Sequence, residues 1–285
     1  MAQIEYLVYF FVFLLGTAVG SFLNVLVLRL DTGIGLQGRS FCFTCGKKLA
    51  WFELIPVLSF LVQKGRCRGC TATISWQYPL VELVSGILFV LIFGKFDLDF
   101  SLGNILYTTY YILIFSLLLA ISVYDIRHKI IPNLLVYLFI VFSLAHTFGV
   151  LDFSHLNFIR NWKLEIGNLL SGPALAAPFA ALWLISKGRW IGFGDAKLAL
   201  GIGWLLGLSG GIAAMLISVW TGALVGVLSI IIGKVFPLLT KGRYYTMKSE
   251  IPFGPFLVLG TLCVFLLGLD AHSVLEWFTF WGAPY

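Results

Sequence analysis

Residues 212–233 read IAAMLISVWTGALVGVLSIIIG, an apolar run that contains no charged side chain. A helix of about 20 consecutive apolar residues crosses the hydrocarbon core of a bilayer. The composition agrees with this reading, because 60% of the residues are hydrophobic, 16% are aromatic and only 11% are charged. This balance is typical of a polytopic membrane protein.

Seven further runs have the same character, so the sequence predicts an all-α polytopic membrane protein with about eight transmembrane helices. The run near 79–94 is short and contains Glu82, and the run near 190–208 is long enough only if it includes Asp195. The first run has no basic region ahead of it, so we expect a retained helix rather than a cleaved signal peptide. The seven runs lie near 6–28, 79–94, 105–123, 133–151, 168–186, 190–208 and 251–269.

A net charge of +6 is compatible with a nucleic-acid partner, but the distribution of the charge indicates membrane topology instead. If the loops alternate across eight spans, one side of the membrane receives 16 of the 19 Lys and Arg residues. By the positive-inside rule that side is cytoplasmic, so both termini face outward. We therefore expect a protein of the inner membrane that contacts the lipid bilayer and no nucleic acid. The basic loops are 29–78, 124–132, 187–197 and 234–250.

Two aspartates lie at the edges of apolar runs, Asp125 in the sequence VYDIR and Asp195 in the sequence GFGDAK. An ionisable group at membrane depth is costly, so each is by default a functional-site hypothesis. With eight spans both fall at the cytoplasmic face. Two carboxyl groups that share one proton are the machinery of an aspartic protease, so the pair is a candidate catalytic dyad. Taken alone, Asp125 could be a helix-end residue and Asp195 a helix N-cap.

Four of the five cysteines form two CxxC pairs, Cys42 with Cys45 and Cys67 with Cys70. This spacing predicts a structural zinc site in which each pair supplies two thiolates to a tetrahedron. Disulfides and unliganded thiols are the alternatives, and the cytoplasmic placement argues against disulfides. We expect the fifth cysteine, inside the last apolar run, to be a packed small side chain.

The loop 29–78 that carries these cysteines is the one extended segment outside the apolar runs. It is too small to bury a core of its own, so a metal is physically expected to stabilise it. Within it, residues 54–62 are apolar but too few to cross a membrane, and we expect them to be interfacial or buried. The predicted organisation is a first transmembrane helix (1–28), a cytoplasmic zinc-binding module (29–78) and a seven-helix block (79–285).

In chain order, six motifs resemble those of type IV prepilin peptidases. They are GSFLNV at 20–25 followed by Arg29-Leu30, the paired CxxC, ELIP at 53–56, YPLVEL at 78–83, Asp125 followed by IPN at 131–133, and GFGD at 192–195. The last resembles the GxGD signature shared with presenilin-type intramembrane proteases. The family usually has Pro after the Arg-Leu pair, where this chain has Asp31.

The resemblance implies a bifunctional membrane enzyme. It would cleave the basic leader of type IV prepilins, or of the pseudopilins of type II secretion, with Asp125 and Asp195 as catalytic residues. It would then methylate the new N-terminal residue with S-adenosyl-L-methionine. One aspartate would be ionised to take a proton from water, while the other would be protonated to polarise the scissile carbonyl. The zinc has no place in this chemistry, because its four-cysteine site is closed.

The methyl-transfer site is expected in 20–82 and at the adjoining membrane surface, since S-adenosylmethionine is polar and cytoplasmic. Arg29 is a candidate partner for the carboxylate of the methyl donor. Glu53 and Glu82 are candidates for orienting the amino group of the substrate.

Two alternatives from other functional classes remain at this point. A transporter also carries intramembrane aspartates, as proton or ion sites, but it would be expected to show paired halves with matching broken helices. A non-enzymatic assembly factor would use the zinc loop as a docking module. Replacement of either aspartate would abolish cleavage in a protease, alter flux in a transporter and leave the binding of a scaffold intact.

Overall fold

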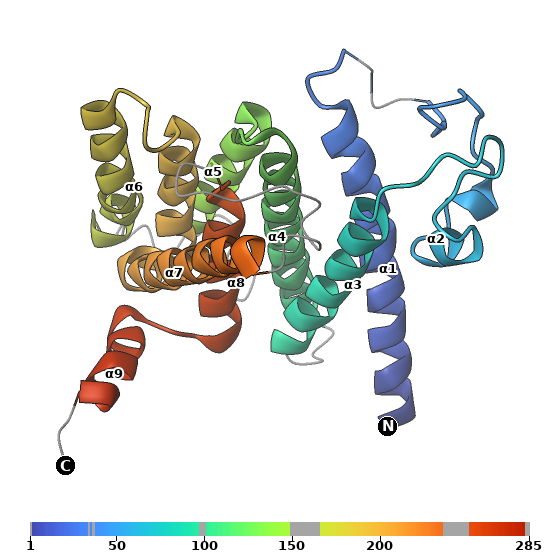
Figure 1. Cartoon of the computed structure of the whole chain (residues 1–285). Coiled ribbons are helices and arrows are strands. Elements are labelled where there is room, and N and C mark those ends of the chain that lie inside the picture. Colours follow the sequence, from blue (N-terminus) through green and yellow to red (C-terminus); the bar gives the residue numbers. More distant parts are fainter. Residues whose placement is uncertain are drawn as a thin grey trace. The chain divides into compact units, whose positions relative to one another are not determined.

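The computed structural model describes residues 2–33, 35, 38–96, 101–148, 166–235 and 251–282. These residues are helical apart from turns, loops and two isolated β-bridges, Phe41 with Lys48 and Arg66 with Thr73. The fold is therefore all-α, as predicted (Figure 1). The elements are α1 (Ala2–Arg29), η1 (Trp51–Glu53), α2 (Leu58–Val62), α3 (Gln77–Lys95), α4 (Leu102–His128), α5 (Asn133–Thr147), α6 (Ile166–Ser186), α7 (Phe193–Val235), α8 (Gly254–Leu267) and α9 (Ala271–Gly282).

The chain forms two compact units, Met1–Val123 and Tyr124–Tyr285, and their boundary lies within α4. The first unit contains α1, the cysteine-bearing loop and α3. The second contains the end of α4 and the helices from α5 onward. The predicted division into 1–28, 29–78 and 79–285 describes functions rather than packing, and it stays an interpretation.

In the first unit α1 and α3 pack as an antiparallel pair with their backbones in contact. A Cβ added to Gly16 of α1 would lie 2.8 Å from the Cα of Gly86 in α3. Nearer the loop, Asn24 donates a hydrogen bond of 3.1 Å from Nδ2 to the carbonyl oxygen of Tyr78. Small residues at such contacts let helices approach closely, which is how membrane helices commonly associate.

In the second unit α5 and α6 pack against the first part of α7. A Cβ added to Gly194 would lie 2.8 Å from the Cβ of Ile131, just before α5, so α5 and this part of α7 start together. The far end of α5 reaches the same helix, because Thr147 donates from Oγ1 to the carbonyl oxygen of Trp204 at 3.0 Å. The Trp204 indole also donates to the carbonyl oxygen of Leu169, near the start of α6. The helix α5 thus runs parallel to the first part of α7, whereas α6 runs antiparallel to it.

The helix α7 changes direction at Gly207, whose φ of 70° and ψ of 178° are not helical. After this break the chain runs antiparallel to α8. A Cβ at Gly222, late in α7, would lie 3.4 Å from Phe256 at the start of α8. At the other end, the amide of Ala271, just after α8, donates to Oγ of Ser209, just after the break.

Five described helices, α1, α3, α4, α6 and α7, are long and apolar enough to cross a membrane. The helices α5 and α8 are apolar but shorter, and the 43 residues of α7 form two helical segments joined at the non-helical Gly207. The helix count therefore supports a multi-pass membrane protein without confirming eight spans. The loop 234–250 and the last residues of the run 133–151 extend outside the described residues.

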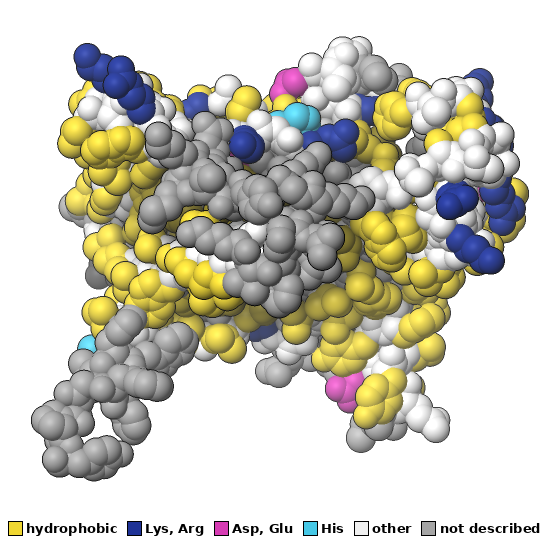
Figure 2. Space-filling view, viewed as in Figure 1, with side chains coloured by type: hydrophobic (Ala, Val, Ile, Leu, Met, Phe, Trp, Pro, Cys, Tyr) yellow, Lys and Arg dark blue, Asp and Glu magenta, His cyan; other side chains and the backbone are white. Residues whose placement is uncertain are grey.

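The short helix α8 ends where Gly268 adopts a left-handed φ of 64°, a common way for helices to end. The helix α9 then starts at Ala271, with the amide of Ser273 donating to Oδ1 of Asp270 at 2.8 Å. The helix α9 was not among the helices predicted from the sequence. Across the face shown in Figure 2, hydrophobic side chains are widely exposed, as expected for helices that contact lipid.

Candidate functional site

Asp125 lies in the last turn of α4 and is buried, with 4% of its surface exposed. Its Oδ2 accepts a hydrogen bond of 3.0 Å from the backbone amide of Gly254, the first residue of α8. A Cβ added to Gly254 would lie 2.6 Å from the same oxygen. Only glycine at this position lets the helix start approach the carboxyl group so closely.

Asp195 lies in the first turn of α7, in the GFGD sequence, and its amide donates to the carbonyl oxygen of Gly192 at 3.2 Å. The two neighbouring glycines serve different purposes. Gly194 packs against Ile131, with room for no side chain of its own. At Gly192 a Cβ would meet no atom nearer than Oδ2 of Asp195, at 3.8 Å, so the backbone beside the carboxyl group is open.

The two aspartates lie in the same unit, and the charge of Asp125 acts electrostatically on Asp195. Their motifs are also joined directly, because Lys197 donates from Nζ to Oδ1 of Asn133 at 2.8 Å. This bond connects the GFGDAK sequence to the IPN sequence that follows Asp125. The fold therefore brings together the two carboxyl groups that sequence analysis paired.

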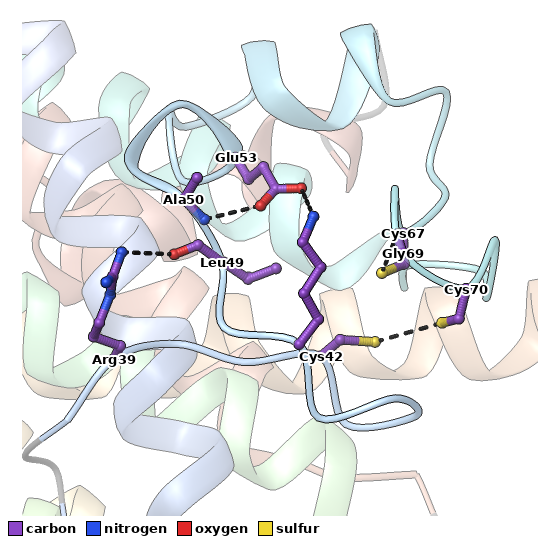
Figure 3. A network of polar contacts seen from close by, with 9 residues as sticks. Arg39, Cys42, Leu49, Ala50, Glu53, Cys67, Gly69 and Cys70 are labelled. Atoms are coloured by element: carbon purple, nitrogen blue, oxygen red, sulfur yellow. Dashed lines mark hydrogen bonds and ion pairs between the residues drawn. The ribbon is translucent and has the colours of Figure 1, made fainter.

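The four cysteines also come together, with their sulfur atoms all within 4.8 Å of one another. Four sulfurs bound to one zinc at about 2.3 Å would be about 3.8 Å apart in a tetrahedron. The Sγ atoms of Cys42 and Cys70 are 3.9 Å apart, close to that separation and far from a disulfide bond (Figure 3). All five cysteines of the chain are free of disulfides.

The two CxxC segments repeat one backbone pattern. The amide of Cys42 donates to the carbonyl oxygen of Lys47, and the amide of Cys67 donates to that of Ala72, each at 2.9 Å. In both segments the residue after the second cysteine has a positive φ, 71° at Gly46 and 57° at Thr71. These paired turns point all four sulfurs to one place, so the donor set fits a structural zinc ion.

The thiols interact strongly. Amides of Cys45 and Thr44 hydrogen-bond the Cys42 sulfur and lower the pKa of its thiol to about 6. At Cys70 the Ala72 amide favours the thiolate, but burial and the neighbouring thiols outweigh it and raise the pKa to about 11. A divalent metal would replace the shared protons and hold all four sulfurs as thiolates.

Glu53 lies beside this cluster, and its side chain is 1% exposed. Its Oε2 accepts a hydrogen bond of 2.8 Å from the Ala50 amide, and its Oε1 pairs with Lys47 Nζ at 2.9 Å (Figure 3). These contacts, the Ala50 amide first, lower the pKa of the Glu53 carboxyl group. Glu53 thus ties η1 to the first CxxC turn.

Arg29 and Glu82, the other residues considered for methyl transfer, lie in the same unit. Arg29 is buried at the end of α1 and donates to the carbonyl oxygens of Gly35 and Arg39. Glu82 is buried in α3, and its Oε2 accepts a hydrogen bond of 2.7 Å from the Val57 amide. Each of the three residues is held by different partners in the first unit.

Three features of these sites were not predicted from the sequence. Gly254 is one, and the only sequence signal for it is the PFGP turn at 252–255. The others are Asn24 and Ser85, both 1% exposed on the facing sides of α1 and α3. Oδ1 of Asn24 and Oγ of Ser85 have no hydrogen-bond partner within the described residues.

Comparisons with known proteins agree with the motif pattern. The bacterial peptidase A24 N-terminal domain matches residues 14–96, and the type IV leader peptidase family matches residues 112–227. A prepilin leader peptidase/N-methyltransferase of Bacillus subtilis (strain 168) is 31% identical over 258 residues, which cover 90% of this chain and 93% of the relative. One of Xanthomonas campestris is 30% identical over 288 residues, covering 90% of each chain. One of Myxococcus xanthus is 44% identical over 124 residues, 43% of this chain and 35% of the relative. No solved structure matches the chain.

Proposed function

The chain belongs to the type IV leader peptidase family, and on this premise we propose that it cleaves the leader peptide of prepilins or pseudopilins and then N-methylates the new N-terminal residue. The observation that carries the peptidase assignment is the pair formed by the buried Asp125 and the half-buried Asp195, which lie in one unit and interact electrostatically. Family membership leaves the transporter and assembly-factor alternatives without support.

In the proposed cleavage step, one carboxyl group is ionised and takes a proton from the attacking water. The other is protonated and donates to the scissile carbonyl oxygen, because two like charges at close quarters share one proton. The Gly254 amide holds Asp125 in one orientation. The open backbone at Gly192 gives the extended substrate room to approach Asp195.

We also propose eight crossings, with the aspartates at the cytoplasmic face of the inner membrane and both termini outside. A continuous helix as long as α7 would extend about 65 Å, about twice the hydrocarbon thickness, so the break at Gly207 suits two crossings. Eight alternating crossings also require α5 to be parallel to the first part of α7, α6 to be antiparallel to it, and α8 to be antiparallel to the second part, as the packing contacts indicate. A prepilin would present its basic leader and apolar helix at that face.

For methyl transfer we propose S-adenosyl-L-methionine as the donor, with Arg29, Glu53 and Glu82 in the site. Glu82 has the strongest case, since a buried carboxyl group inside a candidate membrane span is costly unless it serves a function. The unpartnered oxygens of Asn24 and Ser85 lie on the same helix pair and offer acceptors for a polar ligand. Glu53 has both oxygens engaged, which favours a supporting role for it.

We propose that Cys42, Cys45, Cys67 and Cys70 hold one structural Zn²⁺, which would join the two CxxC turns and stabilise the loop. Metal analysis of purified protein should give one zinc per chain, and Cys45→Ser should lower that value. The same variant should reduce methylation more than cleavage, because the aspartates lie in the other unit. A zinc content below half an equivalent per chain in the unmodified protein would contradict the assignment of a zinc site.

The peptidase assignment is tested with a full-length prepilin in proteoliposomes, with leader loss followed by mass spectrometry. Asp125→Asn and Asp195→Asn should each lower the cleavage rate by about 10³-fold or more, since each removes one of the two proton-transfer groups. Labelled S-adenosylmethionine and a previously processed pilin measure methylation separately, and both variants should retain it. Substantial cleavage by either variant would exclude the aspartic mechanism.

A further inference from the structure

The loop that carries the cysteines exposes an apolar surface at α2. Leu58, Leu61 and Val62 are 60%, 58% and 67% exposed, whereas Phe60 between them is buried. Trp76, at the start of α3, is also exposed and packs against Phe60 with ring centroids 4.8 Å apart. Neither the proposed zinc site nor the proposed dyad uses these residues.

The start of α2 lies well inside the ends of two candidate membrane spans. The amide of Val57 donates to Oε2 of Glu82, which is about 8 Å along α3 from its first residue. The Cα of Glu82 in turn lies against Gly20 of α1, about 14 Å before the end of that helix at Arg29. If both helices cross the membrane as proposed above, this contact places the start of α2 near the membrane interface.

A cationic pocket borders this apolar surface. The chain turns back directly after α2, with the Gly65 amide donating to the carbonyl oxygen of Phe60 at 2.9 Å. The exposed residues Lys64 and Arg66 follow, and with Phe60 and Trp76 they line a pocket of about 590 Å³. Figure 2 displays Lys and Arg side chains beside hydrophobic ones over this part of the first unit.

We propose that α2 and this pocket anchor the cysteine-bearing loop in the membrane interface. The apolar side chains of α2 enter the acyl-chain region, and Lys64 and Arg66 bind the phosphate of an anionic phospholipid. Apolar and aromatic side chains flanked by basic ones are the pattern of interfacial membrane segments. The apolar helix of a prepilin is the competing occupant, but its basic leader would be repelled by the two cations. The inference requires a membrane-spanning chain and does not rest on the peptidase activity.

The test places a photo-crosslinking benzoylphenylalanine at Leu61 of the full-length protein in lipid nanodiscs. The matched control carries it at Lys48, an exposed residue of the first CxxC turn. Irradiation should attach phospholipid to the Leu61 variant and not to the Lys48 variant, as measured by intact mass. In mixed phosphatidylglycerol and phosphatidylcholine discs the adduct should be mainly phosphatidylglycerol. Lys64→Ala and Arg66→Ala should each lower that preference about fivefold, because each basic side chain near an anionic surface contributes about that factor.

Hydrogen exchange on the unmodified chain provides a second readout. Amides of residues 58–66 should exchange more slowly in phosphatidylglycerol discs than in phosphatidylcholine discs. Equal lipid adducts at Leu61 and Lys48, or exchange that does not depend on the lipid, would overturn the proposal. A Leu61 adduct that shifts from lipid to added prepilin would assign the surface to the substrate instead. Loss of leader cleavage with unchanged lipid adducts would leave this inference standing, so the two proposals fail separately.

Discussion

Asp125 depends on a residue 129 positions away in the sequence, because the Gly254 amide orients its carboxyl group. The chemical type of each aspartate and its position beside an apolar run were enough to select the pair from sequence. The glycine carried no such signal, since its role comes from the packing of α8 against the end of α4. The same holds for Asn24 and Ser85, whose burial results from the close approach of α1 and α3.

We predict that Gly254→Ala lowers the cleavage rate about 100-fold. The new Cβ would overlap Oδ2 of Asp125 and force the carboxyl group to rotate, and a displacement of about 1 Å is enough for such a loss. Gly226→Ala is the matched control, because a Cβ there meets only Ile251 at an ordinary 3.6 Å. The rate of leader loss from a prepilin measures both. Equal rates for the two variants would mean that the Gly254 contact does not orient the dyad.

Glu53 leads to a prediction about pH. The Ala50 amide first, and Lys47 second, lower the pKa of the Glu53 carboxyl group in the folded state. The ionised carboxylate therefore stabilises the loop at pH values above the pKa that Glu53 has in the unfolded chain. That contribution is lost as the pH falls through the folded pKa. The difference in amide protection between the unmodified chain and Glu53→Gln should be constant above a pH of about 5.5 and shrink below about 4.5.

Hydrogen exchange of residues 41–53 at several pH values measures this difference. Protonation of the cysteines affects both proteins alike, so it cancels in the comparison. A difference that grows on acidification would contradict the stated role of the ionised carboxylate.

At the scale of elements, the sequence separated the runs 190–208 and 212–233, and the break at Gly207 lies near that separation. The first and last residues of the helices were harder to predict from the apolar runs. Pro132 sets the start of α5 at the start of its apolar run, whereas α8 begins at Gly254 and ends before the left-handed Gly268, inside both ends of the run 251–269. The helix α9 was missed because polar residues interrupt its apolar ones, and a search for continuous apolar runs passes over such a pattern.

We predict that Gly207→Ala destabilises the protein by about 1–3 kcal/mol, because φ 70° with ψ 178° is a conformation essentially restricted to glycine. No atom lies within 4 Å of the added Cβ, so the effect would come from the backbone alone. Gly226→Ala again serves as the control and should be neutral or stabilising, since that glycine is helical. Thermal unfolding in detergent measures both. A Gly207→Ala midpoint equal to that of the control would argue that the break is not required.

At the scale of the whole chain, contacts within the second unit indicate which helix ends lie on the same side of the membrane. Asp195 lies at the start of α7 and Gly254 at the start of α8. Asp125 lies beside Gly254, from whose amide it accepts a hydrogen bond. Ser209, just after the break in α7, meets Ala271, just after the opposite end of α8. The separate runs 190–208 and 212–233 predicted a reversal between them, but they could not identify Gly207 as the residue at which it occurs, because that depends on one backbone conformation.

The final prediction follows from that reversal. With two crossings in α7, Lys187 faces the cytoplasm and Leu208 faces outward, whereas a single crossing would leave Leu208 within the bilayer. Both residues are exposed and suit replacement by cysteine in a Cys263→Ala background. A membrane-impermeant maleimide applied to intact spheroplasts should label Leu208→Cys and not Lys187→Cys, and permeabilisation should make Lys187→Cys reactive. The modified position is identified by peptide mass spectrometry, because Cys42, Cys45, Cys67 and Cys70 remain in the chain. The inverse pattern would place the aspartates outside, and an unreactive Leu208→Cys on both sides would restore a single crossing.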